Sequence, residues 1–441
     1  MSGARGDGEC RSASAAEEAF YGSSLEVVSP TSYDDLADVI RSATEKKRLI
    51  IPAGLGRHAY VGNLPAANGV PAEPLIVSMQ HFSDVLRYEP ADFTVGVQAG
   101  TRLEDLQDVL AENGQEISID WTRASAGTVG GAVAVGLDGP RRGSAGTYRS
   151  FIIGNVGMRG TGVIYKTGGM VVKNVAGYDV GKLLVGSLGT LGVILEVNFK
   201  LYPIARAHAV QACCFESRGA AESFLRSFRD AHLEPSSISI LDPAAATTLA
   251  TELGASLTGW TILWVFEGNS QSVRHLEQQV SKLSSSDALP ALSTLDEALV
   301  APARQWLTDF DTTADPTEDG LAIVRFSTLP TRVFDAHHAF SKALERTSVS
   351  VSFLADSLSG VCLSRLEGTN EALGNAIDKL KNCFAELGCN ARLVFASPGI
   401  RQKHSYLLHG DANRALAQRI QDVFDPGRIF HPGRVSPTPP H

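Results

Sequence analysis

The sequence lacks the hallmarks of a membrane protein and of a nucleic-acid-binding protein. None of its 441 residues lies in an uninterrupted apolar stretch of the roughly 18 residues that a membrane helix requires. Acidic residues outnumber basic ones, 48 against 39, and the net charge is −9. Because binding to a phosphate backbone needs a basic field, nucleic acid is excluded as the main partner. The sequence therefore predicts a soluble globular protein.

Cysteine is scarce and is not arranged for metal binding. No CxxC pair of the kind that iron–sulfur clusters and structural zinc favour occurs among the cysteines, which stand at positions 10, 213, 214, 362, 383 and 389. We therefore expect inert thiols and no metal site. Residues 1–24 begin without the apolar segment that export demands and are expected to form a disordered tail. The expected location is the cytoplasm, with any membrane association through partners.

Two nucleotide-binding signatures are also missing. A Rossmann dinucleotide site needs GxGxxG between its first strand and helix, whereas this chain reads "VVSPTSYDD" there. The Walker A pattern GxxxxGK[ST] is absent as well. A Rossmann dehydrogenase is therefore disfavoured and a Walker A nucleotidase is excluded.

Apolar periodicity from residue 25 onward predicts alternating strands and helices. A helix over 32–47, capped by Ser32 or Thr31, lies between strands over 25–30 and 48–54. Further strands are predicted over 74–79 and 92–100, and a helix over 102–114. Residues 206–400 read as a second α+β domain with helices over 218–233 and 370–388, and residues 401–441 as a terminal helix and a Pro/Gly-rich tail. No repeat of 20–50 residues is evident.

Glycine is concentrated in one part of the chain, since residues 127–192 contain 18 of the 42 glycines. Glycine lets main-chain N–H groups reach phosphate oxygens without an obstructing Cβ. Two loops, 52–62 and 125–146, suit the two sides of a pyrophosphate-containing cofactor. Tight turns in a β-rich domain are the alternative explanation.

Four ordered segments resemble a known family. They are "RYEPADFTVGVQAGTRLEDLQDVLAENGQ", "AGTVGGAVAVGLDGPRR", "GYDVGKLLVGSLGTLGVILEVNFKLYP" and the terminal "FDPGRIFHPGR". Together they resemble the FAD-binding domain shared by vanillyl-alcohol oxidase and p-cresol methylhydroxylase, and within that family the FAD-binding subunit of bacterial glycolate oxidase. The resemblance implies an α+β fold: a two-subdomain FAD-binding domain over 25–205, with subdomains of about 25–85 and 86–205, and an α+β C-terminal substrate or cap domain. The terminal helix and tail, 401–441, would pack back on the FAD domain.

The resemblance also implies which residues bind FAD. The first loop would wrap the pyrophosphate, the second would bind it from the other side, "KNVAGYD" would run near the flavin, and a main-chain stretch would follow the adenosine half. The implied FAD-binding residues are Gly54, Leu55, Gly56, Arg57, His58, Ala59, Ser125, Thr128, Gly130, Gly131, Lys173, Asn174, Gly177, Tyr178, Asp179, Gly192 and Val193. A solvated charge at Lys173 and a helix cap at Asp179 remain alternatives. Arg57, not His58, falls at the position of the family's covalent linkage, so the FAD is expected to be non-covalent.

The chemistry implied is hydride transfer from the Cα of a 2-hydroxy acid to flavin N5. Arg325, mid-strand among apolar residues, is a candidate clamp for the substrate carboxylate, with a buried structural ion pair as the alternative. "HGD" at 409–411 resembles a metal-binding stretch found in the larger catalytic subunit of bacterial glycolate oxidase, but it lacks the second histidine of that stretch. Asp411 is therefore predicted to cap the last helix instead.

Electrons would have to leave through partners, because the chain has no cluster-binding cysteine pattern. The resemblance implies a second flavoprotein subunit and an iron–sulfur subunit. Two functions stay open: a glycolate oxidase-like dehydrogenase subunit, and a flavin-binding electron-transfer or assembly subunit without its own substrate site. A peptidoglycan-precursor reductase of the same superfamily is disfavoured, because nothing in the second domain supports its chemistry.

Overall fold

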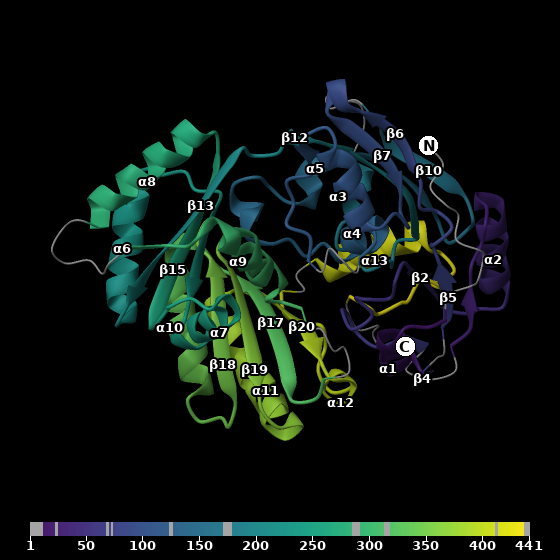
Figure 1. Cartoon of the computed structure of the whole chain (residues 1–441). Helices are drawn as coiled ribbons and strands as arrows, with labels where there is room; N and C mark the ends of the chain where they lie inside the picture. Colours follow the sequence, from purple (N-terminus) through teal and green to yellow (C-terminus); the bar gives the residue numbers. More distant parts are fainter. Residues whose placement is uncertain are drawn as a thin grey trace.

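The chain forms two lobes, each built around a large sheet (Figure 1). The computed structural model describes residues 12–22, 25–67, 70–71, 74–122, 127–170, 179–284, 292–312, 318–410 and 413–435. Helices and sheets are mixed in both lobes, which confirms the predicted α+β class. Two short two-stranded sheets pair β3 (Ala66–Ala67) with β4 (Val70–Pro71), and β8 (Gln115–Glu116) with β12 (Tyr202–Pro203).

A small parallel sheet opens the N-terminal lobe, and a helix covers one of its faces. Its strands run in the order β1–β5–β2, and the elements are β1 (Val27–Val28), α2 (Tyr33–Glu45), β2 (Ile50–Ala53) and β5 (Leu75–Ser78). Ser32 caps α2, because its side chain accepts a hydrogen bond from the Asp35 amide at 3.1 Å. Leu36 and Ile40, one turn apart, are fully buried on the sheet. The predicted βαβ opening is therefore present.

A five-stranded antiparallel sheet completes this lobe. Its order is β10–β9–β11–β7–β6, and helices pack on one face around Val95, Val97 and Val197. The strands are β6 (Val85–Glu89), β7 (Thr94–Gln98), β9 (Ile152–Met158), β10 (Ile164–Gly168) and β11 (Val193–Lys200). The helices are α3 (Leu103–Ala111), α4 (Val129–Val135) and α5 (Tyr148–Phe151), with 3-10 turns η1 (Pro90–Asp92), η3 (Pro140–Gly143) and η4 (Val180–Leu184).

The C-terminal lobe consists of two βαββαβ units joined edge to edge. In the described sheet of nine strands, β16–β13–β15–β14 and β20–β17–β19–β18 repeat one strand order, and the units meet where β14 pairs with β18. The first unit contains β13 (Ala207–Phe215), α6 (Arg218–Asp230), β14 (Ser237–Leu241), α7 (Pro243–Leu253), β15 (Trp260–Gly268), α8 (Ser270–Ser284) and β16 (Leu292–Thr294). The sequence showed no repeat, because the two units share topology and not side chains.

The second unit follows a connecting helix, α9 (Glu297–Asp309). Its elements are β17 (Leu321–Ser327), η5 (Pro330–Arg332), α10 (Val333–Leu344), β18 (Ser350–Asp356), β19 (Val361–Glu367), α11 (Asn370–Leu387) and β20 (Asn390–Ala396). After α12 (Pro398–Arg401), an edge strand β21 (Leu407–His409) joins the same sheet, so this sheet continues beyond residue 400.

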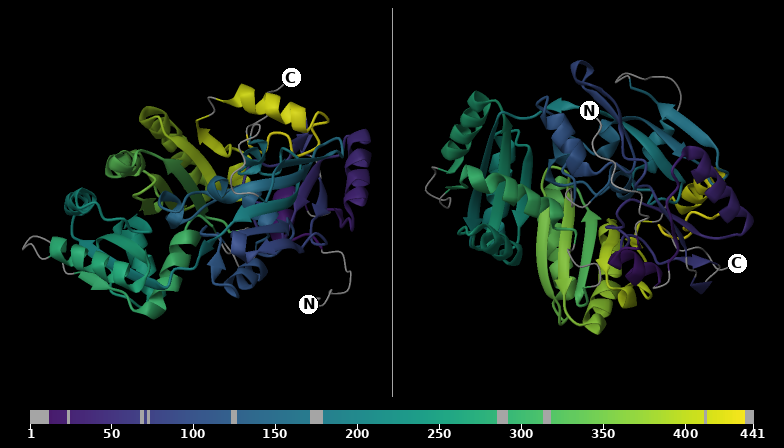
Figure 2. Two further views of the ribbon diagram at one scale, coloured as in Figure 1. Left: turned by 90° about the horizontal axis from the view of Figure 1, so that it is seen from above. Right: turned by 45° about the vertical axis from the view of Figure 1, so that its right-hand side comes forward.

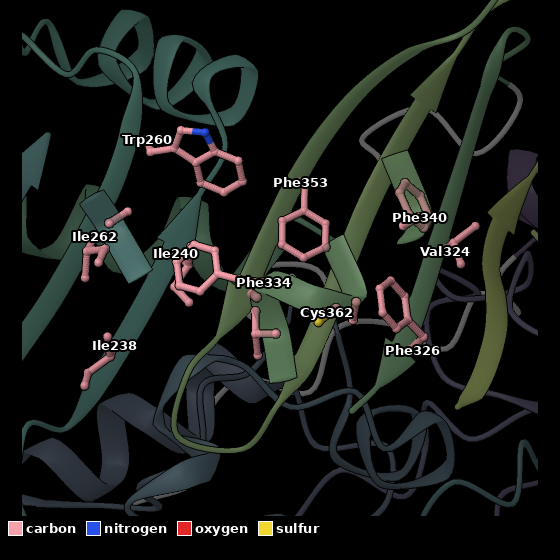
Figure 3. Close-up of a cluster of buried hydrophobic side chains, with 14 of the residues drawn as sticks. Ile238, Ile240, Trp260, Ile262, Val324, Phe326, Phe334, Phe340, Phe353 and Cys362 are labelled. Atoms are coloured by element: carbon pink, nitrogen blue, oxygen red, sulfur yellow. The ribbon is translucent and has the colours of Figure 1, made fainter. Parts of the chain in front are cut away.

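Both faces of the nine-stranded sheet are buried. One face, drawn in Figure 3, packs Ile238, Ile240, Trp260 and Phe326 against α6, α8, α10 and α11. The opposite face packs Leu241, Leu263 and Leu354 against α7 and α9. Neighbouring residues such as Ile240 and Leu241 therefore serve different cores, as the two-residue side-chain period of a strand requires.

The first and the last described segments of the chain both pack on the N-terminal lobe (Figure 2). Helix α13 (Arg414–Phe424) is followed by a tail in which the Ile429 carbonyl accepts a hydrogen bond from the Ile50 amide at 2.7 Å. Before the first sheet, α1 (Ala15–Tyr21) is held by a capping box between Ser14 and Glu17 and buries Tyr21. The expected disordered tail over 1–24 is therefore wrong for residues 15–21, because this segment buries apolar side chains on the lobe.

Candidate cofactor-binding site

A cleft with about 860 Å³ of empty space, mouth included, lies in the N-terminal lobe. Its walls come from segments far apart in the sequence: residues 51–59, 127–135 and 188–194, helix α1 and Arg434. The two glycine-rich loops predicted to bind a pyrophosphate thus contribute to one cleft.

The first wall is a turn with unused amides. The N–H groups of Gly54, Leu55, Gly56 and Arg57 donate no hydrogen bond within the described residues. Gly56 has a φ of +68°, a conformation that glycine adopts without steric cost. Successive unpaired amides beside a cleft form a concavity that binds anions. The backbone here fits a phosphate group.

The second wall touches the first. A Cβ on Gly54 would lie 2.1 Å from Oγ1 of Thr128, so only a glycine permits this approach of the two loops. The amide of Gly130 donates to the Ala99 carbonyl at 2.7 Å, and that of Gly131 to Thr128 Oγ1 at 3.4 Å. These two amides are therefore used within the protein, and Gly130 serves close packing of α4 against β7.

The third wall is the start of β11. Gly192 has a φ of +115°, and a Cβ there would lie 2.3 Å from the carbonyl oxygen of Met158 on the neighbouring strand. Val193 follows as the first residue of β11 and also lines the cleft. Bare backbone on all three walls suits a long cofactor that is held by main chain.

The predicted FAD-binding residues fall into three groups. Most line the cleft: Gly54, Leu55, Gly56, Arg57, His58, Ala59, Thr128, Gly130, Gly131, Gly192 and Val193. Asp179 is not among the lining residues; it stands at the N-cap position of η4 without a capping hydrogen bond and pairs with Lys182 at 2.7 Å. The others lie outside the described residues, namely Ser125, Lys173, Asn174, Gly177 and Tyr178.

Arg325 lies away from the cleft in a buried ion-pair cluster. Its Nη1 bonds Asp311 at 2.5 Å and its Nη2 bonds the Asp138 carboxylate at 3.0 Å. Burial lowers the pKa of Arg325, but the two carboxylates outweigh burial and leave that pKa raised. Asp138 is also paired with Arg142 at 3.0 Å. The arrangement matches the ion-pair alternative for Arg325. Asp411 lies outside the described residues, and Asn413 occupies the N-cap position of α13.

Sequence reasoning missed three polar side chains that line the cleft. Glu17 and Tyr21 come from α1, and Arg434 comes from the tail. The guanidinium of Arg434 lies 5.3 Å above the Tyr21 ring. Burial raises the pKa of Tyr21, and Arg434 partly offsets this. The pattern Ser14-x-x-Glu17 is a capping-box signature and could have located α1; nothing local could have placed Arg434.

Comparison with known proteins agrees with the geometry. A family model described as "FAD binding domain" matches residues 25–168, which include the first loop and α4. FAD is the cofactor, as predicted. The bare walls and free amides of the cleft fit its diphosphate.

Several curated proteins are similar in sequence. Glycolate oxidase subunit GlcE of Escherichia coli is 32% identical over 39% of this chain and 47% of its own length. Glycolate oxidase subunit GlcD of Bacillus subtilis is 28% identical over 49% of this chain and 45% of its own. The matches thus span about half the length of these two relatives. D-lactate dehydrogenase of Anaerostipes hadrus is 25% identical over 95% of this chain and 91% of its own. These names confirm the resemblance found in the sequence.

A solved structure shares the fold of both lobes. p-Cresol methylhydroxylase with substrate bound superposes with a TM-score of 0.70 at 16% identity, covering 93% of this chain and 88% of that chain. The predicted fold, an FAD-binding domain of this type followed by an α+β domain, is therefore confirmed. None of the described helices is long and apolar enough to cross a membrane. The described residues also include no group of three or more metal-ligating side chains.

Proposed function

We propose that the protein is an FAD-binding subunit of a glycolate oxidase-like 2-hydroxy-acid dehydrogenase. The observation that carries the proposal is the cleft in which Gly54 to Arg57 offer free amides opposite Thr128. The names of the relatives support the substrate class, since they act on glycolate and D-lactate. The bound flavin would supply a hydride acceptor for the Cα–H of the substrate.

The chain's own contribution to this chemistry is to bind and orient the cofactor. Main-chain donors of the first loop would hold the diphosphate. The glycines at 54, 130 and 192 let the walls of the cleft pack closely against Thr128, Ala99 and Met158. Arg57 at the first loop carries no nucleophilic imidazole, which supports a non-covalent flavin. Electrons would then pass to a partner, as the likeness to glycolate oxidase subunits suggests.

A second candidate is a flavin-binding electron-transfer or assembly subunit without a substrate site. One observation favours it: between the lobes, Arg325 is already paired with two carboxylates, Asp311 and Asp138. A paired cation in this position is less able to hold a substrate carboxylate, because binding would first have to break the buried pairs.

The test is anaerobic titration of the purified chain with glycolate, D-lactate and D-2-hydroxyglutarate while the visible flavin absorbance is recorded. Bleaching by any of them without partners supports the dehydrogenase. Flavin that stays oxidised alone but bleaches when the partner subunits are added supports the second candidate. A folded chain that takes up no FAD would refute both.

A further inference from the structure

Among the residues that the structure describes, four arginines are strongly buried, and they differ in how their charge is balanced. Arg325 pairs with Asp311 and Asp138, and Arg141 pairs with Asp120 and Glu116 at 2.8 Å each. Arg401 and Arg434, which are 4% and 5% exposed, form no ion pair with any described carboxylate. We call Arg401 and Arg434 the unpaired arginines. Because a buried cation without a counter-charge is costly, their position needs an explanation.

The unpaired arginines lie behind the first loop of the cleft. Arg434 donates from Nη2 to the Ala59 carbonyl at 2.9 Å, two residues after the free amides of Gly54 to Arg57. Arg401 donates to the carbonyls of Val394 at 3.3 Å and Tyr60 at 3.5 Å. Both guanidinium groups therefore donate hydrogen bonds to consecutive carbonyls, those of Ala59 and Tyr60, in the same segment of the N-terminal lobe.

Their remaining contacts are neutral. The Nη1 of Arg434 contacts Nε2 of His431 at 3.4 Å, and burial and Arg434 together hold the pKa of His431 well below its usual range. A neutral imidazole can accept this hydrogen bond but brings no negative charge. Arg401 has Nε and Nη1 without any hydrogen-bond partner in the described part of the chain. Burial lowers the pKa of Arg401, with Arg434 adding to the effect.

One buried carboxylate belongs to the same cleft lining. Glu17 also lines the cleft, and its Oε2 accepts a hydrogen bond from the Ser14 amide at 2.7 Å as part of the capping box. Among the described residues, it forms no ion pair with Arg434. The lining of the cleft therefore includes one guanidinium, that of Arg434, and a row of free amides, together with the Glu17 carboxylate held by the capping box. Arg401 lies behind Arg434.

We propose that Arg434 is the counter-cation of the cofactor's diphosphate, and that Arg401 strengthens the positive field without touching the cofactor. The charge that balances these arginines is then brought by the ligand, whereas Arg141 and Arg325 receive theirs from the protein. Arg434 would act as a binding residue and Arg401 as a positioning residue. The inference rests on the assignment of this cleft to FAD.

The test measures FAD and ADP binding to apoprotein of the full chain. Arg434→Met removes the charge and keeps the aliphatic stem, and Arg434→Lys keeps a point charge. We expect Arg434→Met to weaken FAD binding by about 10- to 100-fold, the usual worth of a charge-assisted hydrogen bond. Arg434→Lys should recover part of this loss, and added salt should weaken FAD binding less in Arg434→Met than in the wild type.

Arg428→Met is the matched control. Arg428 lies in the same tail but is half-exposed and bonds Asp422 at 2.9 Å, away from the cleft lining. The FAD affinity of Arg428→Met should stay within about twofold of wild type, since ion pairs on the surface contribute little to stability. ADP carries the diphosphate without the flavin, so competition by ADP should weaken in Arg434→Met by the same factor as FAD binding.

Two results would overturn the inference. One is an Arg434→Met variant whose affinities for FAD and ADP stay within about threefold of wild type, even if its apoprotein melts at a lower temperature; Arg434 would then only tie the tail to the first loop. The other is a loss of FAD affinity with unchanged ADP affinity. Wild-type apoprotein that binds no FAD would instead refute the proposed function itself.

Discussion

Gly192 offers the sharpest test of the cleft's geometry. Replacing it with alanine places a Cβ 2.3 Å from the Met158 carbonyl oxygen, a backbone atom that the sheet holds in place. The φ of +115° is in addition unfavourable for alanine. A strained backbone conformation costs about 1–3 kcal/mol and overpacking about as much again, so Gly192→Ala should lower the free energy of unfolding by about 2–6 kcal/mol.

Gly189→Ala is the matched control for this substitution. Gly189 has a φ of +77° in the same segment, but a Cβ at this position would have Cδ of Pro52, at 3.8 Å, as its nearest neighbour. Only the cost of placing alanine in a left-handed backbone conformation applies here, about 1–2 kcal/mol. Urea unfolding of both apoproteins, followed by circular dichroism, gives the comparison. Equal destabilisation by the two substitutions would show that the close approach of Gly192 to Met158 does not constrain the fold.

Three further predictions concern other sites. Arg325→Met leaves Asp311 buried without its cation and should lower the free energy of unfolding by about 3–5 kcal/mol. Adding Asp311→Asn to the same chain should restore part of this stability. A urea midpoint for Arg325→Met like that of the wild type would contradict the buried pair. Burial lowers the pKa of His337 to about 4, so the free energy of unfolding should fall by about 3 kcal/mol as the pH drops from about 6.5 to 4. In urea unfolding curves recorded at several pH values, His337→Leu should reduce this loss. His338→Leu, at the exposed neighbour, should leave it unchanged. Acid precipitation should release all flavin into the supernatant, whereas fluorescence that stays with the denatured chain would show a covalent bond.

Local patterns predicted the elements that surround the cleft. The Ser32 cap, the buried stripe of α2 and Gly114 after α3 all gave boundaries that the structure reproduces within a few residues. These features act over one or two turns, so the sequence displays them directly. The bare backbone at Gly192 could also be inferred, because the dense run of glycines over 127–192 would destabilise ordinary helices.

Long-range features were not visible in the same way. The pairing of the two βαββαβ units through β14 and β18 joins segments more than 100 positions apart and leaves no periodic signal. Helix α1 did have a local signal in Ser14 and Glu17, but the polar composition around it suggested a disordered tail. What stabilises α1 is burial of Phe20 and Tyr21 on the lobe, and that contact cannot be inferred from a seven-residue helix alone.

Arg325 and Arg434 differ in what the sequence alone reveals about their partners. A charged residue among apolar ones predicted that Arg325 would need a partner, but its partners, Asp311 and Asp138, are fixed only by the fold. The sequence of the tail does not indicate that Arg434 is buried, because its hydrogen bond to Ala59 joins residues 375 positions apart. In the folded protein both arginines are buried, but the cost of burying their charge is offset in different ways. Arg325 is neutralised by the protein and has no charge to offer a ligand. Arg434 forms no ion pair with a described carboxylate and lines the cleft, so we propose that the cofactor supplies its counter-charge.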